Sequence, residues 1–591
     1  MELQQVTYDI CRNYLQDRRE TLPKEIFDRL HGLVRGRAYK DLATCFTDSM
    51  HDVTCVEAAR TLHQVEAFFK KNASFTDRLQ ARLAALLSFE TGEELCESTN
   101  KALDEIYFNP DKHPVAVKQI ESCQRYIQMV LGDFSDFLEE LPKLVSVTAG
   151  ATATNSRRRS IPFLKINKRI VCTPGAFPYL DSLSDHFGYG SLQGRLISEN
   201  RISFVPKSWK TERTIACEAE GNMFLQLAVD KYVKRRLRNF GIDLSDQGLN
   251  QELAKEGSIN GDLATIDLSM ASDTLAYNTV SLLFPGDWFQ FLRSIRSQYF
   301  SMYPDKRQAY AKFSSMGNGA TFVLETLVFA ACCRALRPST FTVYGDDIVI
   351  DSVLADGLIE LLATLGFVPN TDKTYSSGPF RESCGKSWWK GFDITPRYIR
   401  GVDRRKATWC HLINTMVSIS KPCGLLQKYL SSIVKDKQLP LVPWNEDTMS
   451  GVWITPHDAY SLNLIRIHTR GKRAWKPMYR GYQSQSRLLR CSDMRALFLW
   501  HLAKQELAAA WWQSPIWRLS SGRRLSLTLS YRKPYEATRY SASRHRYVRK
   551  WVHWRPVEAG VPDNLNWFSD LLVPVGSRGD ARASSQATRS E

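Results

Sequence analysis

The sequence predicts an α+β fold, and two patterns along the chain support this class. From Met1 to about Leu144, apolar residues recur at three- and four-residue steps, which is the spacing of amphipathic helices. Between about Arg201 and Arg400, short β-branched and aromatic segments alternate with helical segments and sharp turns. Beyond Val402 the pattern becomes helical and mixed again. With 591 residues, 43% of them hydrophobic, the chain can bury a large core or several subdomains.

The charge balance favours a polyanionic partner. The chain has 79 Lys and Arg against 62 Asp and Glu, a formal charge of +17, so nucleic acid is the first expectation. No apolar run approaches the length of a membrane span, and the N-terminus lacks the pattern of a secretory signal. We therefore expect no membrane association and a cytoplasmic location. The 13 cysteines are scattered and expected to be reduced, without Cys and His pairs at zinc-ligand spacing.

An acidic turn lies between two strand-like segments. Phe341-Thr342-Val343 and Ile348-Val349-Ile350 flank Tyr344-Gly345-Asp346-Asp347, a pattern typical of a tight hairpin. Gly345 can adopt the positive φ of such a turn, which lets both carboxylates approach one place. Adjacent acids between apolar strands repel each other, so we expect a cation there, with Mg²⁺ as the natural candidate. The alternative is an ordinary surface hairpin, because Gly-Asp turns are common.

A second acidic element lies upstream of this hairpin. Leu263–Ile266 is strand-like and is followed directly by Asp267. If this strand lies beside the hairpin, Asp267 joins Asp346 and Asp347 as an oxygen ligand, the set needed to hold two Mg²⁺ about 3.5–4 Å apart. Such a pair activates an attacking 3′-hydroxyl and neutralises the departing pyrophosphate. The three aspartates therefore indicate phosphoryl transfer.

Two further elements have chemistry that suits the same site. Asp273 follows the Asp267 turn, near a helix start, where its carboxylate could cap amides or accept a hydrogen bond from a sugar hydroxyl. The loop Ser314–Thr321 contains two glycines and leads into the apolar helix candidate Phe322–Ala331. Its glycines would let a template backbone or base pair approach closely, although a plain turn before a helix has the same pattern.

A basic segment precedes both acidic elements. Lys207, Lys210 and Arg213 are three residues apart, so in a helix or a twisted ribbon they could share one face. Together they would form a cationic clamp for an incoming triphosphate. Taken alone, such a cluster is more often a solvated surface.

The order of these elements resembles the RNA-directed RNA polymerases, and most closely the replicase catalytic (beta) subunits of single-stranded RNA bacteriophages of the Qβ and MS2 kind. The matching segments lie between about Arg201 and Arg400 and include the strings Ser-Ser-Met-Gly-Asn-Gly and Phe-Arg-Glu-Ser-Cys-Gly-Lys. They are Phe204–Ala216, Ile266–Thr274, Ser314–Glu325, Val343–Ile350, Asn370–Thr374, Gly378–Gly385 and Thr395–Arg400.

The resemblance implies roles for individual residues. It implies a two-metal nucleotidyltransferase using Mg²⁺, which Mn²⁺ can replace, with Lys373 as a general-acid candidate; Lys373 could equally be an ion-pair partner of Asp372. Glu325 stands where many viral polymerases have an Asn that assists 2′-hydroxyl selection. The remaining implied contacts are with the metal (Asp267, Asp346, Asp347), the nucleotide (Lys207, Lys210, Arg213, Asp273, Ser315, Gly317, Asn318) and the template RNA (Gly319, Thr321, Tyr344).

The implied architecture is a right hand of fingers, a palm with an antiparallel sheet, and a helical thumb. The expected segments are an N-terminal helical part of the fingers (1–150), fingers with the basic segment (151–260), a catalytic palm (261–400), a thumb with a basic C-terminal region (401–555) and a partly disordered tail (556–591). The resemblance also implies viral RNA replication in the cytoplasm of a bacterial host. The implied partners are RNA template and product, ribonucleoside triphosphates, the elongation factors EF-Tu and EF-Ts, and a ribosomal protein.

Two basic regions and two rival functions stay open. The stretch 148–159 is a linker or an RNA contact, and the Arg- and Trp-rich stretch 517–554 either binds RNA by phosphate contacts and stacking or packs the thumb. A reverse transcriptase is the nearest enzymatic rival, although it usually blocks the 2′-hydroxyl with an aromatic side chain, and this chain has Asp273 after Asp267. A non-catalytic RNA-binding protein would explain the charge but not the three central aspartates.

Overall fold

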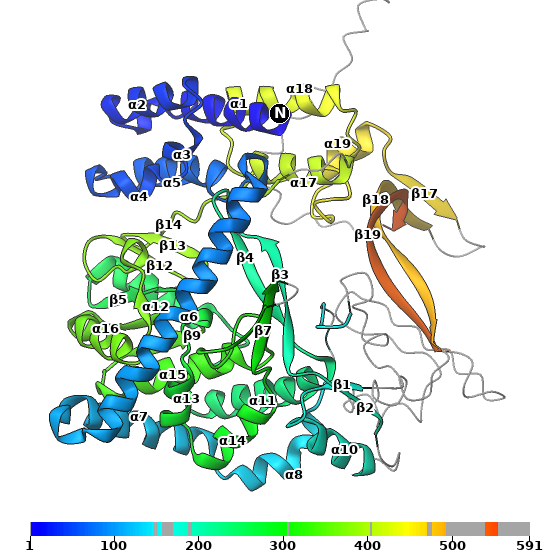
Figure 1. Ribbon diagram of the computed structural model, residues 1–591. Coiled ribbons are helices and arrows are strands. Elements are labelled where there is room, and N and C mark those ends of the chain that lie inside the picture. Colours follow the sequence, from blue (N-terminus) through cyan, green and yellow to red (C-terminus); the bar gives the residue numbers. More distant parts are fainter. Residues whose placement is uncertain are drawn as a thin grey trace, which may run out of the picture. The chain divides into compact units, whose positions relative to one another are not determined.

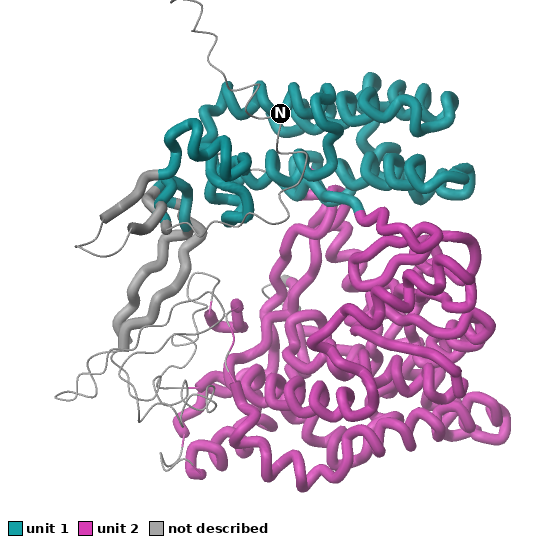
Figure 2. The backbone as a smooth tube through the Cα atoms, turned by 180° about the vertical axis from the view of Figure 1, so that it is seen from behind, with its two compact units in different colours: residues 1–75, 396–486, 543–591 teal, residues 76–395, 487–542 magenta. Residues whose placement is uncertain are grey.

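The computed structural model describes residues 2–146, 148, 150–155, 170–186, 192–303, 306–401, 405–469, 475–491 and 538–553 (Figure 1). These residues form two compact units, which Figure 2 colours separately. Unit 1 contains residues 1–75, 396–486 and 543–591, and unit 2 contains 76–395 and 487–542. The arginines of the 148–159 stretch and the predicted tail lie outside the described residues. In the predicted Arg- and Trp-rich region, Arg549 is the one such residue whose side chain is described.

Unit 1 is mainly helical, with buried aromatic side chains between its helices. Tyr14 of the first helix meets Phe68 edge to face at 5.3 Å, and Arg18 donates to the carbonyl of Ile419. Its helices are α1 (Glu2–Gln16), α2 (Lys24–Arg35), α3 (Tyr39–Leu42), α4 (Cys45–Ser49), α5 (Val56–Lys70), α17 (Lys406–Val417), α18 (Leu425–Asp436) and α19 (Pro456–Ser461). Strands β15 (Leu441–Pro443) and β16 (Val452–Ile454) pair in parallel. A separate sheet has the order β17 (Arg466–Thr469), β18 (Trp475–Cys491) and β19 (Thr538–His553).

Unit 2 combines helices with several small sheets. Its helices are α6 (Arg78–Phe108), α7 (Pro114–Leu131), α8 (Phe134–Leu144), α10 (Phe177–His186), α11 (Glu220–Asn239), α12 (Gly248–Asn260), α13 (Tyr277–Leu283), α14 (Gly286–Ser294), α15 (Thr321–Ala335) and α16 (Ala355–Thr364). The α+β class is confirmed. Residues 2–144 are helical as expected, with α6 crossing the front of unit 2 in Figure 1. Within the described residues, no helix is long and apolar enough to cross a bilayer.

The central sheet of unit 2 is a short antiparallel one. Its strand order is β5 (Leu263–Ile266), β10 (Asp347–Asp351) and β9 (Phe341–Tyr344). Ile348 lies opposite Ile266 on one side and Val343 on the other, so the middle strand is bordered by apolar side chains. Helix α15 backs this region and is buried almost all round, as its predominantly apolar sequence predicts.

The other strands of unit 2 form four further sheets. Two are small: β1 (Ile170–Cys172) with β2 (Gly194–Leu196), and β11 (Val368–Pro369) with β6 (Leu268–Ser269). The third has the order β12 (Phe380–Ser383), β13 (Lys386–Trp389), β14 (Phe392–Asp393). The fourth has the order β4 (Glu212–Cys217), β3 (Glu199–Pro206), β7 (Tyr299–Tyr303), β8 (Lys306–Ala309).

Candidate active site

The predicted acidic hairpin is present. Strands β9 and β10 pair antiparallel with Tyr344 opposite Asp347, so Gly345 and Asp346 form a two-residue turn. Gly345 has φ +62°, the left-handed conformation that glycine adopts without strain. Its amide donates to the Thr326 hydroxyl at 3.1 Å, and a Cβ here would lie 2.4 Å from the Phe322 ring. The turn is therefore held tightly against α15.

Strand β5 brings the third aspartate to the same end of the sheet. Because Ile266 pairs with Ile348, the next residues along the two strands are Asp267 and Asp347. Asp346, at the hairpin tip, is exposed. A cavity of about 170 Å³ lies at this point. Its lining residues are Asp267, Asp346, Asp347, Lys373, Glu382 and Gly385.

Burial and mutual repulsion raise the pKa values of the hairpin carboxyls. Burial raises the pKa of Asp347 to about 7, with Asp346, Asp267 and Glu382 adding to the effect against one opposing hydrogen bond from the Cys384 amide at 3.1 Å. Asp346 is exposed as a whole residue, yet partial enclosure of its carboxyl group at the cavity raises its pKa, and repulsion from Asp267 raises it further. This is the electrostatic signature of carboxylates that lack sufficient positive charge.

The set of donors suits a hard divalent cation. The cavity gathers carboxylate oxygens and no thiol or imidazole, which is the ligand chemistry of Mg²⁺ or Mn²⁺. Among the described residues, no three His, Cys, Asp or Glu side chains already stand in ligating geometry. Asp267 and Asp347 instead each accept hydrogen bonds from protein donors. These hydrogen bonds use Oδ2 of Asp267 and Oδ1 of Asp347, so they can persist while the second oxygen of each carboxylate binds a cation.

Lys373 supplies the nearest cation. Its ammonium lies 3.2 Å from Asp267, and Asn370 donates to the same carboxylate oxygen at 2.8 Å. Burial lowers the pKa of Lys373, but attraction to Asp267 and Glu382 outweighs it and leaves the pKa above its ordinary value. The ion-pair partner is therefore Asp267, and not Asp372, which was the alternative that the sequence left open.

The three predicted basic residues lie on a β-hairpin. Of the two possibilities that the sequence left open, a helix and a twisted ribbon, this is the twisted ribbon. Val205 of β3 pairs with Arg213 of β4, while Lys207 and Lys210 lie in the connection between the strands. Lys207 is exposed as a whole, yet partial burial of its ammonium lowers its pKa. Arg213 and Lys373 lower this pKa further, whereas Asp267 and Asp346 oppose the shift. The hairpin thus brings Lys207 and Arg213 within electrostatic reach of the cavity. No contact among the described residues joins Lys210 to the cavity lining.

The glycine loop is fastened to β4. The Ala216 amide donates to the carbonyl of Met316 at 2.8 Å, and a Cβ on Gly317, which has φ +119°, would lie 2.2 Å from the Ala216 oxygen. The Gly319 amide donates to the Gln226 side chain at 2.9 Å, and the Asn318 side chain accepts from the Ala320 amide at 2.9 Å.

Several residues of the predicted RNA-contacting set make internal contacts. The hydroxyl of Thr321 is buried and bonds to the Ser314 hydroxyl at 2.8 Å. Ser315, which was predicted to contact the nucleotide and not the RNA, has a buried hydroxyl without a partner among the described residues. The Tyr344 ring packs edge to face on Phe322 at 5.5 Å and is half-buried. Contact of this set with RNA stays a prediction.

Asp273 belongs to a buried ion cluster that the sequence reasoning missed. Lys312, whose side chain is 0% exposed, lies 3.1 Å from Asp273 and 3.2 Å from Glu93 of α6. Its ammonium also stands 3.6 Å above the Phe89 ring. No capping contact of Asp273 accompanies these. A lysine and a glutamate separated by more than 200 residues leave no local sequence signal, so only the fold reveals the cluster.

Glu325 and Glu382 complete the acidic surroundings. Glu325 is 4% exposed, and one of its carboxyl oxygens has no hydrogen-bond partner among the described residues. Burial raises its pKa well above the usual range, and Asp346 and Asp273 raise it further. Glu382 of β12 lines the cavity. It falls within a segment that the family resemblance matched, but no role was assigned to it from the sequence.

Comparison with known proteins places the chain in a family. The family model described as RNA replicase, beta-chain, matches residues 57–449. An RNA-directed RNA polymerase subunit beta of Qbeta virus (strain MX1) is 40% identical over 338 residues, covering 56% of this chain and 57% of that protein. The subunit beta of Enterobacteria phage SP is 37% identical over 377 residues, covering 62% of this chain and 65% of that protein.

The chain therefore spans less than two thirds of the length of each of these relatives. Among solved structures, the RNA-dependent RNA polymerase of a human picobirnavirus matches 51% of this chain and 82% of that one, with 11% identity and a TM-score of 0.31.

The family model covers well over half of the chain, from α5 through the site to the residues after α18. This chain belongs to the RNA replicase beta-chain family.

Proposed function

We propose that this chain is an RNA-directed RNA polymerase that adds ribonucleotides to the 3′-hydroxyl of a growing RNA on an RNA template. One observation carries the proposal: three aspartates, two from the β9–β10 hairpin and one from the end of β5, line a single cavity together with Lys373. Lys207 and Arg213 lie within electrostatic reach of it. Raised carboxyl pKa values beside cationic side chains suit a site that binds divalent metal and a triphosphate together. The family's printed name agrees with this chemistry.

Asp267, Asp346 and Asp347 are the proposed metal ligands. Two Mg²⁺ ions, or Mn²⁺ in their place, would activate the 3′-hydroxyl and neutralise charge on the pyrophosphate. The strand pairing of β5 with β10 fixes the distance between the aspartates before any ion arrives. The Asn370 and Lys373 hydrogen bonds orient Asp267, and the Cys384 amide orients Asp347.

The cations have separate proposed roles. Lys207 and Arg213, with Lys210 beyond them, contact the triphosphate, since flexible ammonium and forked guanidinium groups both suit phosphate oxygens. Lys373 is the candidate proton donor to pyrophosphate, because it stays protonated beside Asp267.

The remaining polar residues bind the ribose and the RNA. Asp273 selects the ribose together with Ser315, Gly317 and Asn318, and Lys312 and Glu93 hold Asp273 in place. Gly319, Thr321 and Tyr344 lie beside the template.

The wider assignments are proposals of the same kind. They are a right-hand arrangement, the five segment boundaries given above, a place in the cytoplasm of a bacterial host, and association with EF-Tu, EF-Ts and a ribosomal protein. The helical and mixed character after residue 405 supports a thumb there. Adding bacterial extract to the purified chain tests the host partners, because a requirement for extract would reveal missing subunits.

The central test is incorporation of labelled GTP on a poly(C) template with Mg²⁺. We expect the wild type to synthesise RNA, Asp346→Asn to lose synthesis while retaining RNA binding, and exposed Asp356→Asn on α16 to behave as wild type. Preference for GTP over dGTP would separate this activity from reverse transcription. Equal use of both would contradict the ribonucleotide assignment, and RNA binding without synthesis under every condition would favour a binding protein.

A further inference from the structure

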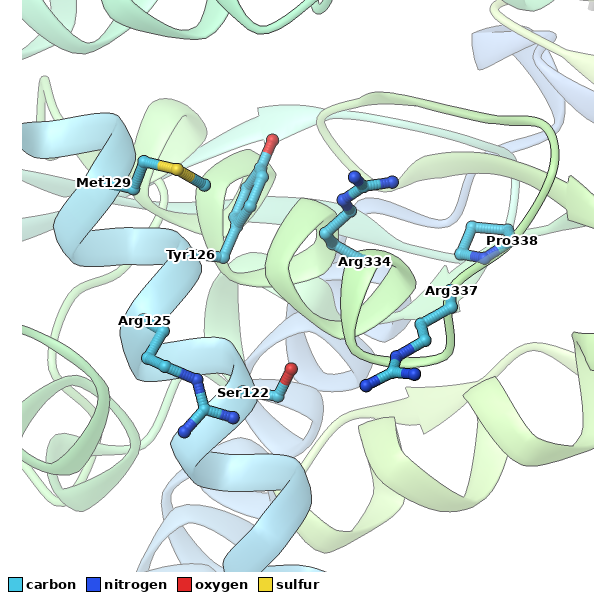
Figure 3. Close-up of a pocket in the computed structure, with 7 residues that line it drawn as sticks. All are labelled: Ser122, Arg125, Tyr126, Met129, Arg334, Arg337 and Pro338. Atoms are coloured by element: carbon cyan, nitrogen blue, oxygen red, sulfur yellow. The ribbon is translucent and has the colours of Figure 1, made fainter.

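A second cavity in unit 2 lies away from the carboxylates, between α7 and the C-terminal end of α15. It has a volume of about 450 Å³ and is lined by Ser122, Arg125, Tyr126, Met129, Arg334, Arg337 and Pro338 (Figure 3). Helix α15 begins at the glycine loop, and its 15 residues rise by about 20 Å in total. This cavity is therefore separated from the glycine loop by the whole length of α15.

Three guanidinium groups border this cavity with little negative charge to balance them. Among the described residues, neither Arg334 nor Arg337 has an ion-pair partner, and both are exposed. Arg125 faces Glu121 at 3.7 Å, but both side chains are more than half exposed, so this pair contributes little. A helix C-terminus favours the arginine of its last turn, which accounts for Arg334 but not for Arg125 on another helix.

The frame that holds these arginines is rigid. The Arg337 amide donates to the Arg334 carbonyl at 3.1 Å, and Arg337 has φ +55°, which turns the chain sharply after α15. Beyond it, the Asp351 carboxylate accepts the amide of Ser339 at 2.7 Å and that of Thr340. A side chain presented from a fixed turn loses less conformational freedom on binding than one on a mobile loop.

Uncharged groups between the arginines suit a phosphate and its attached nucleoside. Burial raises the pKa of the Tyr126 hydroxyl to about 12, although Arg334 lowers it, so the phenol remains a hydrogen-bond donor. Figure 3 shows Tyr126 beside Arg334, and Ser122 between Arg125 and Arg337. Met129 is 54% exposed and adds an apolar edge. Guanidinium forks with hydroxyl donors are the groups that bind phosphate oxygens in nucleic-acid sites.

We propose that the cavity bordered by Arg125, Arg334 and Arg337 is an auxiliary RNA-binding site that holds phosphate groups of an RNA strand away from the catalytic cavity. Its open, exposed guanidinium groups suit a strand passing over the surface better than an enclosed free nucleotide. The inference rests on the proposed function for RNA as the partner, although the cavity itself does not depend on catalysis. A free nucleotide would offer the same phosphate chemistry.

The test measures binding of fluorescent oligo(C) to the full chain over a series of salt concentrations. We expect Arg334→Gln and Arg337→Gln each to weaken binding several-fold and to reduce the slope of log affinity against log salt by about 1. Arg293→Gln is the matched control, because Arg293 is also an exposed arginine in the last turn of a helix, α14. Equal slopes for all three variants would overturn the proposal.

Two further arms separate the alternatives. If labelled GTP binding, and not oligo(C) binding, depends on Arg334, the RNA assignment is overturned in favour of a nucleotide. If polyglutamate binding alone depends on Arg334, an acidic protein segment replaces RNA as the ligand. GTP incorporation is measured in parallel. If the arginine variants are active and bind oligo(C) normally, the auxiliary site is contradicted and the polymerase activity is not. If the wild type is inactive but its binding depends on Arg334, the proposed polymerase activity is contradicted and the auxiliary site is not.

Discussion

Two charged clusters within unit 2 differ in how their charges are balanced. At the buried cluster, one fully buried lysine, Lys312, has the carboxylates of Glu93 and Asp273 at 3.2 and 3.1 Å and an aromatic ring beneath it. At the cavity of the candidate active site, Asp346 and Asp347 lie near Asp267, and among the described ion pairs Lys373 contacts Asp267 alone. The first cluster keeps one negative charge, because one lysine faces two carboxylates, but both carboxylates contact the cation and we call this cluster balanced. In the second cluster, Asp346 and Asp347 have no ion-pair partner among the described residues, and we call it unbalanced. Carboxylates that are paired within the protein therefore indicate a structural role, and carboxylates without a partner indicate a site that binds a ligand.

The largest expected effect comes from removing a carboxylate at the unbalanced cluster. Asp347→Asn should reduce GTP incorporation by about 10³-fold or more, because a proposed metal ligand is lost. The free energy of unfolding should not fall, since the substitution removes a buried charge whose pKa is already raised. Incorporation assays and urea denaturation of the same preparation measure both quantities. A large loss of stability would show that Asp347 is structural.

The opposite result is expected at the balanced cluster. Lys312→Met leaves Glu93 and Asp273 without their cation, and breaking a buried ion pair costs about 3–5 kcal/mol of stability. Urea denaturation measures this loss. Because Asp273 would then be free to turn, discrimination between GTP and dGTP should weaken in whatever protein stays folded. The double variant Lys312→Met with Glu93→Gln should recover part of the stability, and no recovery would contradict the pairing.

Divalent metal should stabilise the chain only through the unbalanced cluster. Mg²⁺ at about 100 times its dissociation constant should add about 2.7 kcal/mol of stability for a single site, seen as a rise in Tm. The rise should disappear in Asp347→Asn but persist in Glu93→Gln, and chelator should reverse it. A Tm that is insensitive to Mg²⁺ in the wild type would argue against metal at the cavity.

The smallest expected effect concerns Lys373. Replacing it with Gln removes the proposed general acid and should lower kcat by about 10²-fold or less. Lys373→Arg keeps the charge next to Asp267 but is a poor proton donor, so it distinguishes the two roles. If Lys373→Arg retains full kcat in single-turnover measurements, the lysine only orients Asp267.

The sequence predicted the strands of the acidic hairpin because their signals are local. Apolar β-branched runs, a glycine turn and acids at the strand ends lie within ten residues, so both the hairpin and the position of Asp347 follow from short-range patterns. The partner of Lys373 could not be predicted this way. Asp372 is its sequence neighbour, but the antiparallel pairing of β11 with β6 brings the lysine back to Asp267.

Long-range contacts account for most of what the sequence did not predict. Lys312 reaches Glu93 across the fold, and Arg334 and Arg125 line one cavity only because α15 packs on α7. Arg381 is another example: it is 0% exposed, and its guanidinium donates to the Leu263 carbonyl at 2.7 Å and to carbonyls of residues 376–378 and 380. In the sequence alone, a buried arginine of this kind cannot be distinguished from a surface arginine, because its burial depends on the strands that pack around it.

The close contact at Gly317 has a consequence for the genetics of this position. Its backbone packs against Ala216 on the strand that also carries Arg213, and a hydrogen bond from the Ala216 amide to the Met316 carbonyl joins the loop to that strand. A single methyl group added by Gly317→Ala would force the loop away from that strand and oppose the positive φ. Under the proposed function, a virus carrying this change should grow only at lower temperatures. Revertants should map to both the loop and the strand, although the two are about a hundred residues apart in the gene.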